Sequence, residues 1–283
     1  MLENKKNNPL DPGLYVVSTP IGNLSDITLR ALNVLKQSDY VLCEDTRHSL
    51  KLLNFYKIKK KLVSFHKFNE TKKCKEIFDD IEGGKIISLI SDAGTPLISD
   101  PGEFLVKSAR EKKIKVIPVP GPSAITAAFS IAGFSSKFFF FGFLSKKTKE
   151  RIQQLESLSR VVSCIILYLP ARDLKKSLEE FKIYFESRIV FIAREITKLH
   201  ETYLSGTAEE LLRNIGANDL KGEITVVISD KSVDLKNAED VNLVYEINLL
   251  INKMSSKDIA EYLAKKLKIS KKIIYQNILD LEK

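Results

Sequence analysis

Cysteine and histidine are scarce in this 283-residue chain, with three of each, and neither is arranged as metal or redox chemistry requires. Cys43, Cys74 and Cys164 lie far apart in or beside apolar stretches, and none belongs to a CxxC pair. This spacing excludes zinc ribbons and thiol-exchange motifs and favours buried free thiols. The histidines show no HxxxH spacing, so we predict that the protein has no metal site.

Long hydrophobic runs are also missing. The longest, such as Val161–Leu169, fall well short of the roughly twenty residues that cross a bilayer. The polar segment Met1–Gly13 has none of the apolar character of a signal peptide or anchor. We therefore expect a cytoplasmic protein without membrane attachment, with residues 1–12 forming a disordered N-terminus.

Positive charge is in excess, because 45 Lys and Arg residues against 36 Asp and Glu residues give a net charge of +9. Lys57–Lys75 holds eight lysines and one acid, and Ser145–Arg151 is a second basic stretch. Such a surface attracts polyanions such as nucleic acids. A solvated lysine-rich surface without a partner explains the charge equally well.

From Leu14 to about Phe143, short β-rich runs alternate with helical stretches, which predicts βαβ units and a largely parallel sheet in a domain spanning residues 13–144. The expected strands are Leu14–Ser18, Tyr40–Cys43, Leu62–Phe65, Ile86–Ser91, Val116–Val119 and Phe138–Phe141. The expected helices are Ile27–Gln37, Glu70–Ile81 and Ala124–Ala132, capped by Asp26, Asn69 and Ser123, with Gly133 ending the last one.

The pattern of residues 145–230 indicates a second, smaller mixed α/β domain. Its expected elements are helices Arg151–Leu158 and Leu174–Tyr184, strands Val161–Leu169, Ile189–Ala193, Glu201–Leu204 and Glu223–Ser229, and a helix behind a capping box that begins at Thr207. Residues 231–283 follow as an all-helical unit with expected helices Val241–Lys253, Ser256–Leu267 and Ser270–Leu281. This unit is compatible with a helix-turn-helix, although helical bundles that only pack on a parent domain share the pattern.

Three loops rich in glycine and proline each follow a predicted strand: Ser18–Leu24, Ser91–Leu97 and Pro118–Ala124. Glycine permits close backbone approach and proline fixes the turn, so such loops present rigid main chain to a ligand at the carboxyl edge of a parallel sheet. None matches GxGxxG or GxxxxGK[ST], which disfavours a nicotinamide or triphosphate ligand. A nucleoside cofactor suits them better, and ordinary turn chemistry is the alternative explanation.

Charged residues follow two further strands, in Cys43–His48 and His66–Glu70. Their carboxylates, imidazoles and guanidinium are suited to acid, base or phosphate-binding roles. Helix capping and surface ion pairs explain each residue singly just as well.

In their order along the chain, four segments resemble the ribosomal RNA small subunit methyltransferase I family, the 2′-O-ribose methyltransferase branch of the tetrapyrrole methylase-like superfamily: Thr19–Thr28, Glu44–His48, Ser91–Gly102 and Pro120–Ala124. Ala193–Lys198, Glu201 and Lys221–Glu223 extend the resemblance through the second half. It implies an α/β fold of two domains with S-adenosyl-L-methionine in the cleft between them, followed by a helix-turn-helix-like unit. It also implies a homodimer that methylates the ribose of cytidine 1402 in 16S rRNA of the small ribosomal subunit.

The resemblance implies a cofactor site formed by Pro20, Gly22, Asp92, Gly94, Ile98, Ser123, Ala124 and Tyr168. Positive charge assigns RNA binding to Lys59, Lys60 and Lys61, and to Arg47 and Arg194, whose guanidinium suits a phosphate. The resemblance adds His48 and Arg172 to this set. For catalysis we place Glu195 and Lys198 ahead of Glu70, because Glu70 has a strong capping alternative. Where the family usually has an acid and a histidine between this tyrosine and arginine, the chain reads Tyr168-Leu169-Pro170-Ala171-Arg172.

Two other functions stay open on the sequence. The first is a C-methyltransferase of the tetrapyrrole branch, although those enzymes typically open on a Gly-rich loop ending in Gly-Asp, which this sequence lacks. The second is a non-enzymatic nucleic-acid-binding protein built on the C-terminal helices, which would have no affinity for the cofactor.

Overall fold

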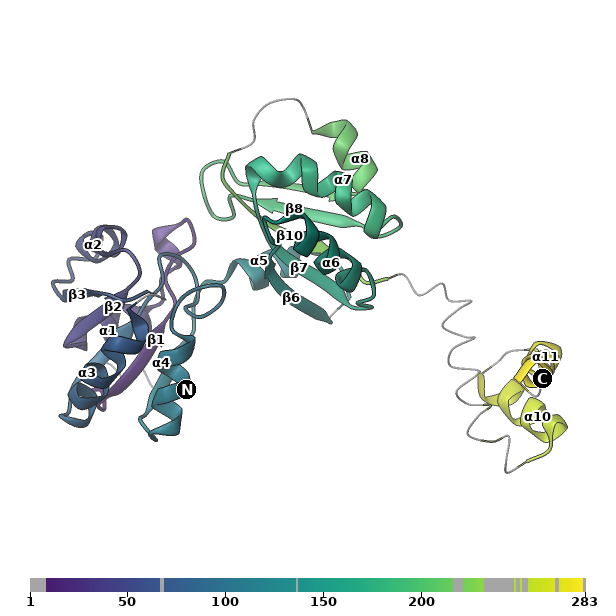
Figure 1. Ribbon diagram of the computed structural model, residues 1–283, viewed down its shortest axis with the longest axis horizontal. Helices are drawn as coiled ribbons and strands as arrows, with labels where there is room; N and C mark the ends of the chain where they lie inside the picture. Colours follow the sequence, from purple (N-terminus) through teal and green to yellow (C-terminus); the bar gives the residue numbers. More distant parts are fainter. Residues whose placement is uncertain are drawn as a thin grey trace. The chain divides into compact units, whose positions relative to one another are not determined.

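The computed structural model describes residues 9–66, 69–135, 137–215, 221–231, 247, 250, 254–267 and 270–281. The chain divides into two compact units, residues 1–230 and 231–283 (Figure 1). Within the described ranges, no helix is long and apolar enough to cross a membrane.

The first sheet is entirely parallel, as predicted, with the strand order β3-β2-β4-β1-β5. Its strands are β1 (Gly13–Val17), β2 (Tyr40–Cys43), β3 (Lys61–Ser64), β4 (Ile86–Leu89) and β5 (Val116–Val119). The connections contain a short 3-10 turn, η1 (Leu24–Asp26), and the helices α1 (Leu29–Gln37), α2 (Thr46–Phe55), α3 (Glu70–Glu82) and α4 (Glu103–Glu111).

Alternation along the strands gives this sheet two buried faces. On β2, Tyr40 and Leu42 pack with residues of α3 and α4, whereas Val41 and Cys43 pack with residues of α1 and α2. Side chains of a strand alternate between faces, so a run of four apolar residues fits a strand covered by helices on both sides. All three cysteines are buried free thiols.

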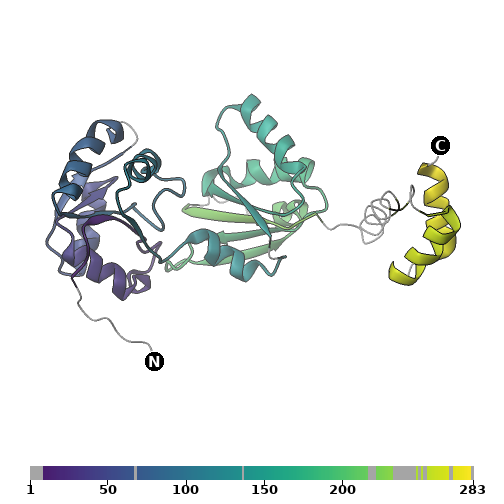
Figure 2. The ribbon, with the colours of Figure 1, turned by 90° about the horizontal axis from the view of Figure 1, so that it is seen from below.

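The second sheet is mixed, with the order β6-β7-β10-β8-β9. Its teal and green strands are seen in Figure 2. Only β6 and β7 pair in parallel, and the other neighbours are antiparallel. Its strands are β6 (Phe138–Phe143), β7 (Cys164–Pro170), β8 (Val190–Arg194), β9 (Thr202–Gly206) and β10 (Glu223–Ile228). Helices α6 (Thr148–Ser159), α7 (Leu174–Tyr184) and α8 (Ala208–Asn214) pack on one face, α5 (Ala124–Ala132) packs on the other, and η2 (Ala171–Asp173) follows β7.

One expected strand lies in the other sheet. The sequence places Phe138–Phe141 in the first half, but β6 pairs with β7, and α5 before it also packs on the second sheet. The part of the chain that builds the second sheet and its helices therefore starts at α5, well before the predicted domain boundary at residue 144. The local pattern could not reveal this, because apolar residues on both faces of a strand fit either sheet equally well.

Helix caps agree with the sequence in part. The capping box of Thr207 and Glu210 and the left-handed Gly133 at the end of α5 are confirmed. The side chain of Thr28, not that of Asp26, caps α1, because the η1 turn takes up the residues before it. Neither Asn69 nor Ser123 makes a side-chain cap bond. Helices α2 and α4 were not among the helices predicted from the sequence.

The start of the described chain is anchored. The backbone N–H of Leu10 donates to Gln37 Oε1 at 3.1 Å, and Lys115 Nζ lies 2.5 Å from Asp11 Oδ2. Leu10 and Asp11, within the segment expected to be disordered, thus have partners on other elements. Residues 1–8 lie outside the described residues.

The second unit contains α10 (Ser256–Leu267) and α11 (Lys271–Leu281), close to two of the expected helices. They bury a small core of Ile247, Ile259, Ala260, Leu263, Ile274 and Ile278. The N-terminal cap of α10 is Ser255, whose Oγ accepts the backbone N–H of Asp258 at 3.3 Å. The expected helix Val241–Lys253 lies outside the described residues except at positions 247 and 250.

Candidate cofactor-binding site

The strand order of the first sheet brings the three glycine- and proline-rich loops together. They follow β1, β4 and β5, and these strands are neighbours in the order β4-β1-β5. Parallel strands end at the same sheet edge, so the loops meet there. Thr19 and Gly94 exchange two backbone hydrogen bonds of 2.9 and 3.0 Å, and the Thr95 hydroxyl contacts Ser18 Oγ at 3.0 Å and donates to the Pro122 carbonyl at 3.3 Å.

Two glycines make this junction possible. Gly94 has φ +77°, in the left-handed region where side chains are strained. A Cβ at Gly121 would stand 2.9 Å from the Cβ of Ser18, closer than such atoms approach. The loops are therefore held as one rigid surface, largely by main-chain contacts.

A cavity of about 520 Å³ opens over these loops and is lined by both sheets of the first unit. Seven predicted site residues line it: Asp92, Gly94, Ile98, Ser123, Ala124, Tyr168 and Lys198. Further lining residues that were not assigned to the site include Ile21, Glu44, Thr95, Asp100, Phe143 and Glu223. Among the described residues, no cluster of His, Cys, Asp and Glu could hold a metal ion.

Pro20 and Gly22 flank the lining residue Ile21 without lining the cavity themselves. Gly22 lies against the loop after β8. A Cβ at position 22 would stand 2.5 Å from Lys198 Cγ and 2.8 Å from the carbonyl oxygen of Ile196. The loop after β1 and the loop after β8 thus pack directly against each other, although they follow strands of different sheets.

The side chains of Glu195, Lys198 and Glu223 form a charged cluster beside the cavity. Lys198 Nζ donates to Glu195 Oε1 at 2.8 Å and to Glu223 Oε2 at 2.9 Å. Glu195 Oε1 also accepts the backbone N–H of Glu223 at 2.9 Å. A Cβ at Gly222 would stand 2.6 Å from Glu195 Cδ, so the missing side chain at 222 leaves room for that carboxylate.

The surroundings fix the charges of this cluster. Burial opposes ionisation of Glu195, but bonds from Lys198 and the Glu223 backbone, with the charges of Lys198 and Arg194, outweigh it and lower its pKa. Burial likewise opposes charging of Lys198, and its bonds to the two glutamates still raise its pKa. Both groups are therefore charged near neutral pH, and a protonated amine cannot accept a proton.

Tyr168 lines the cavity as a neutral phenol. Burial, followed by the negative charges of Asp100 and Glu223, raises the pKa of Tyr168 to about 12. Its ring contacts Phe140 and Phe143, with centroids 5.1 and 5.4 Å away.

The structure argues against Glu70 as a catalytic base. Its side chain is buried, and Oε1 accepts the backbone N–H of Leu105, the third residue of α4, at 2.9 Å. First-turn N–H groups have no partner within their own helix, so Glu70 caps α4 from the neighbouring α3. It does not line the cavity.

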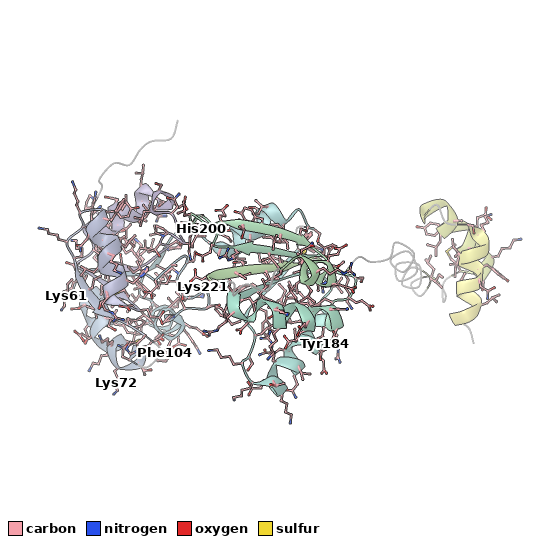
Figure 3. All side chains as sticks on the ribbon, turned by 90° about the horizontal axis from the view of Figure 1, so that it is seen from above. Lys61, Lys72, Phe104, Tyr184, His200 and Lys221 are labelled. Carbon is pink, nitrogen blue, oxygen red and sulfur yellow. The ribbon has the colours of Figure 1, made fainter. Side chains whose placement is uncertain are left out.

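None of the residues assigned to RNA lines the cavity. Arg47 forms a two-pronged ion pair with Asp45, at 2.7 and 3.1 Å, which lowers the pKa of Asp45. Arg194 Nε donates to the Lys221 carbonyl at 2.8 Å. The other five are Lys60, which is partly exposed, and His48, Lys59, Lys61 and Arg172, which are exposed. Lys61 and Lys72, another exposed lysine of the basic stretch, extend from the part that holds the first sheet (Figure 3).

The family profile described as Tetrapyrrole (Corrin/Porphyrin) Methylases matches residues 13–212. A protein of Mycoplasmopsis pulmonis named ribosomal RNA small subunit methyltransferase I is 46% identical over 215 residues, covering 76% of this chain and 96% of that protein. The protein of the same name from Mesorhizobium japonicum is 39% identical and covers 97% of this chain and 94% of its own length. The chain belongs to the ribosomal RNA small subunit methyltransferase I family.

The fold is that of the wider tetrapyrrole methylases. The crystal structure of a cobalt precorrin-4 methyltransferase superposes with a TM-score of 0.57 at 19% identity, covering 76% of this chain and 94% of that chain. At this identity the likeness shows the shared fold alone. It confirms the tetrapyrrole methylase-like fold predicted from the sequence.

Methyltransferases of this family use S-adenosylmethionine, and the residues of the cavity fit it. About 520 Å³ lies within the range of small-ligand sites. Ser123 and Ala124 bring the first turn of α5 to the cavity, where orphan N–H groups suit a carboxylate. The Asp92 carboxylate offers an acceptor for an ammonium or hydroxyl group. The missing side chain at Gly94 leaves the backbone open to close approach.

Four residues that line the cavity, three acidic and one aromatic, were not assigned to the site from the sequence, for different reasons. Glu44, Asp100 and Glu223 all lie within segments that resemble the family, so position within those segments could have suggested them. Phe143 lies in a run of phenylalanines that looks like an ordinary buried strand, and nothing in the sequence marks it.

Proposed function

We propose that this protein transfers the methyl group of S-adenosylmethionine to the ribose 2′-hydroxyl of a cytidine, cytidine 1402 of 16S rRNA, in the small ribosomal subunit. The observation that carries the proposal is the 46% identity with a relative of that family name over 96% of its length. We further propose that it acts as a homodimer in the cytoplasm.

The cofactor supplies a methyl group bound to a positively charged sulfur, and the protein must hold the ribose oxygen in line with it. Asp92, Gly94, Ile98, Ser123, Ala124 and Tyr168 form the cofactor surface, with Pro20 and Gly22 supporting it. Arg47, His48, Lys59, Lys60, Lys61, Arg172 and Arg194 contact RNA phosphates outside the cavity.

Glu195 and Lys198 act together at the reaction site in this proposal. Lys198 lines the cavity as an ammonium, so it is suited to contact a hydroxyl or phosphate oxygen of the substrate. Glu195 holds that ammonium in place through the 2.8 Å bond. The geometry favours positioning by a fixed charge over proton removal by the amine.

The test is methylation of small subunits isolated from cells that lack this modification, with labelled cofactor. The expected product is a single ribose-methylated cytidine, detected as resistance of one phosphodiester bond to alkaline hydrolysis. Label on a base, or none on the RNA while a uroporphyrinogen-type substrate is methylated, would overturn the assignment. Calorimetric titration with S-adenosylhomocysteine measures cofactor affinity separately.

A further inference from the structure

Phe143 is a large aromatic residue that the fold turns out of the core and into the mouth of the cavity. Phe143 is 55% exposed and lines the cavity, whereas Phe138 and Phe139 of the same strand, 43% and 44% exposed, do not line it. An exposed aromatic ring in the lining of a ligand-sized cavity is available to contact what binds there.

A β-bulge produces this exposure. Phe140 pairs in register with Ile166 and Gly142 pairs with Leu167, so Phe141 is an extra residue in β6. Phe143 therefore pairs with Tyr168 and lies on the same sheet face as it.

Without the bulge the face would be reversed. Position 143 would then register with Leu169, which lies in the core cluster against α6 and α7. Gly142 carries the bulge with φ +86°, and a Cβ there would stand 3.3 Å from Ser99 Oγ. The chain thus adopts a glycine-dependent irregularity that removes a phenylalanine from the core.

The neighbouring rings hold Phe143 in place. The ring of Tyr168 lies 5.4 Å from that of Phe143 and 5.1 Å from that of Phe140, so Tyr168 is supported from behind. Rigid exposed rings of this kind bind unstacked nucleobases in proteins that recognise single-stranded RNA.

The charges around Phe143 indicate which part of a nucleotide it meets. Asp100 and Glu223 line the same cavity and repel phosphate, but carboxylates accept hydrogen bonds from amino groups of a base. Lys146, Lys147 and Lys149 are exposed just beyond Phe143 in the sequence and attract the phosphates. An RNA strand would enter with a base inward and its backbone toward the lysines.

We propose that Phe143, backed by Tyr168, is the platform on which a nucleobase of the substrate RNA stacks as its ribose enters the cavity. The proposal deepens the proposed function and rests on it. The variants that test it are Phe143→Ala, Phe143→Leu and Phe143→Trp. Phe139→Ala is the matched control, since Phe139 lies in the same strand, is 44% exposed and does not line the cavity.

The first measurement is steady-state methylation of small subunits by the full chain. Stacking of one base predicts that Phe143→Ala raises KM for the subunits at least about fivefold, that Phe143→Leu also raises it, and that Phe143→Trp stays close to wild type. Affinity for S-adenosylhomocysteine and the oligomeric state should not change. A loss of cofactor affinity would assign the ring to the cofactor, and a changed oligomeric state would assign it to a subunit contact. Wild-type KM in Phe143→Leu, or an equal effect of Phe139→Ala, would overturn the platform.

The second measurement is independent of catalysis. A short single-stranded RNA containing pyrrolocytidine, whose emission is quenched by stacking, is titrated with each protein. We expect quenching by wild type and Phe143→Trp, and binding without quenching by Phe143→Ala. If wild type quenches the probe but does not methylate small subunits, the proposed function is wrong and base stacking on Phe143 is retained. If it methylates subunits without quenching, the stacking proposal is wrong and the proposed function is retained. If it does neither, both proposals are wrong.

Discussion

Gly22 and Lys198 lie so close that a single methyl group cannot be placed between them, since a Cβ at position 22 would stand 2.5 Å from Lys198 Cγ. The two residues belong to loops that follow strands of different sheets. The contact therefore ties the loop after β1, in the first sheet, to the charged cluster of Glu195, Lys198 and Glu223 at the second.

Replacing Gly22 with alanine should open this contact. The loop 196–198 must shift, because the nearest atoms include the Ile196 carbonyl as well as the flexible lysine. We expect affinity for S-adenosylhomocysteine to fall about tenfold or more, with a smaller effect on Tm. The control is Gly83→Ala, where the nearest atom would be 3.3 Å away at the end of α3. Unchanged affinity for S-adenosylhomocysteine in Gly22→Ala would show that the two loops can move apart without affecting cofactor binding.

The charge on Lys198 should matter more than its basicity. Since its pKa is raised and it is protonated at neutral pH, Lys198→Arg should keep clearly more activity than Lys198→Met. Any ionisation near neutral pH in the wild-type pH–rate profile should therefore still be present in Lys198→Arg. If such an ionisation is present in wild type and absent in Lys198→Arg, the Lys198 amine acts as the base after all.

The ion pair of Glu195 and Lys198 predicts a pH dependence of stability. The pKa of Glu195 lies below its unfolded value of 4.5, so its contribution is full above that value and is lost as the pH falls through the folded pKa. The pKa of Lys198 lies above 10.5, so its contribution is full below that value and is lost as the pH rises through the folded pKa. Glu195→Gln should lower Tm at pH 7, and the difference from wild type should shrink in acid. A constant difference down to about pH 2 would contradict the shift.

Glu70 illustrates why the sequence could not settle the catalytic residues. The same segment suggests a base and a helix cap, and the cap exists, but on α4 and not on the helix that Glu70 begins. Which helix lies above Glu70 depends on the packing of α3 against α4, and no local pattern encodes that.

The cofactor loops were more accessible to prediction than the walls of the cavity. Their glycines and prolines mark rigid turns, and parallel strands bring such turns to one edge, while the family resemblance singled out Asp92, Gly94 and Ser123 within them. Phe143 could not, because one extra residue in β6 reverses the face of everything after it.

Removing the Glu70 carboxylate should affect folding and spare chemistry. Glu70→Ala leaves the Leu105 N–H without its acceptor and should cost about 1 kcal/mol of stability, measured by denaturant unfolding. Glu70→Gln keeps an acceptor oxygen and removes the basic group. It should turn over near the wild-type rate, whereas loss of a general base would reduce the rate by roughly a hundredfold or more.

Removal of residues 231–283 should leave cofactor binding intact. All the described residues that line the cavity precede Asp230, within a unit that is compact by itself. We expect the shortened protein to bind S-adenosylhomocysteine with a Kd within about twofold of the full chain. Loss of binding with unchanged circular dichroism of the α/β part would show that the C-terminal unit supports the cavity. If binding is retained, any rise in KM for small subunits measures what residues 231–283 contribute to holding the RNA. If residues 231–283 include lysines that bind RNA phosphates, the shortened protein should also bind small subunits with a weaker dependence on salt concentration, because each such lysine releases counterions from the RNA when it binds.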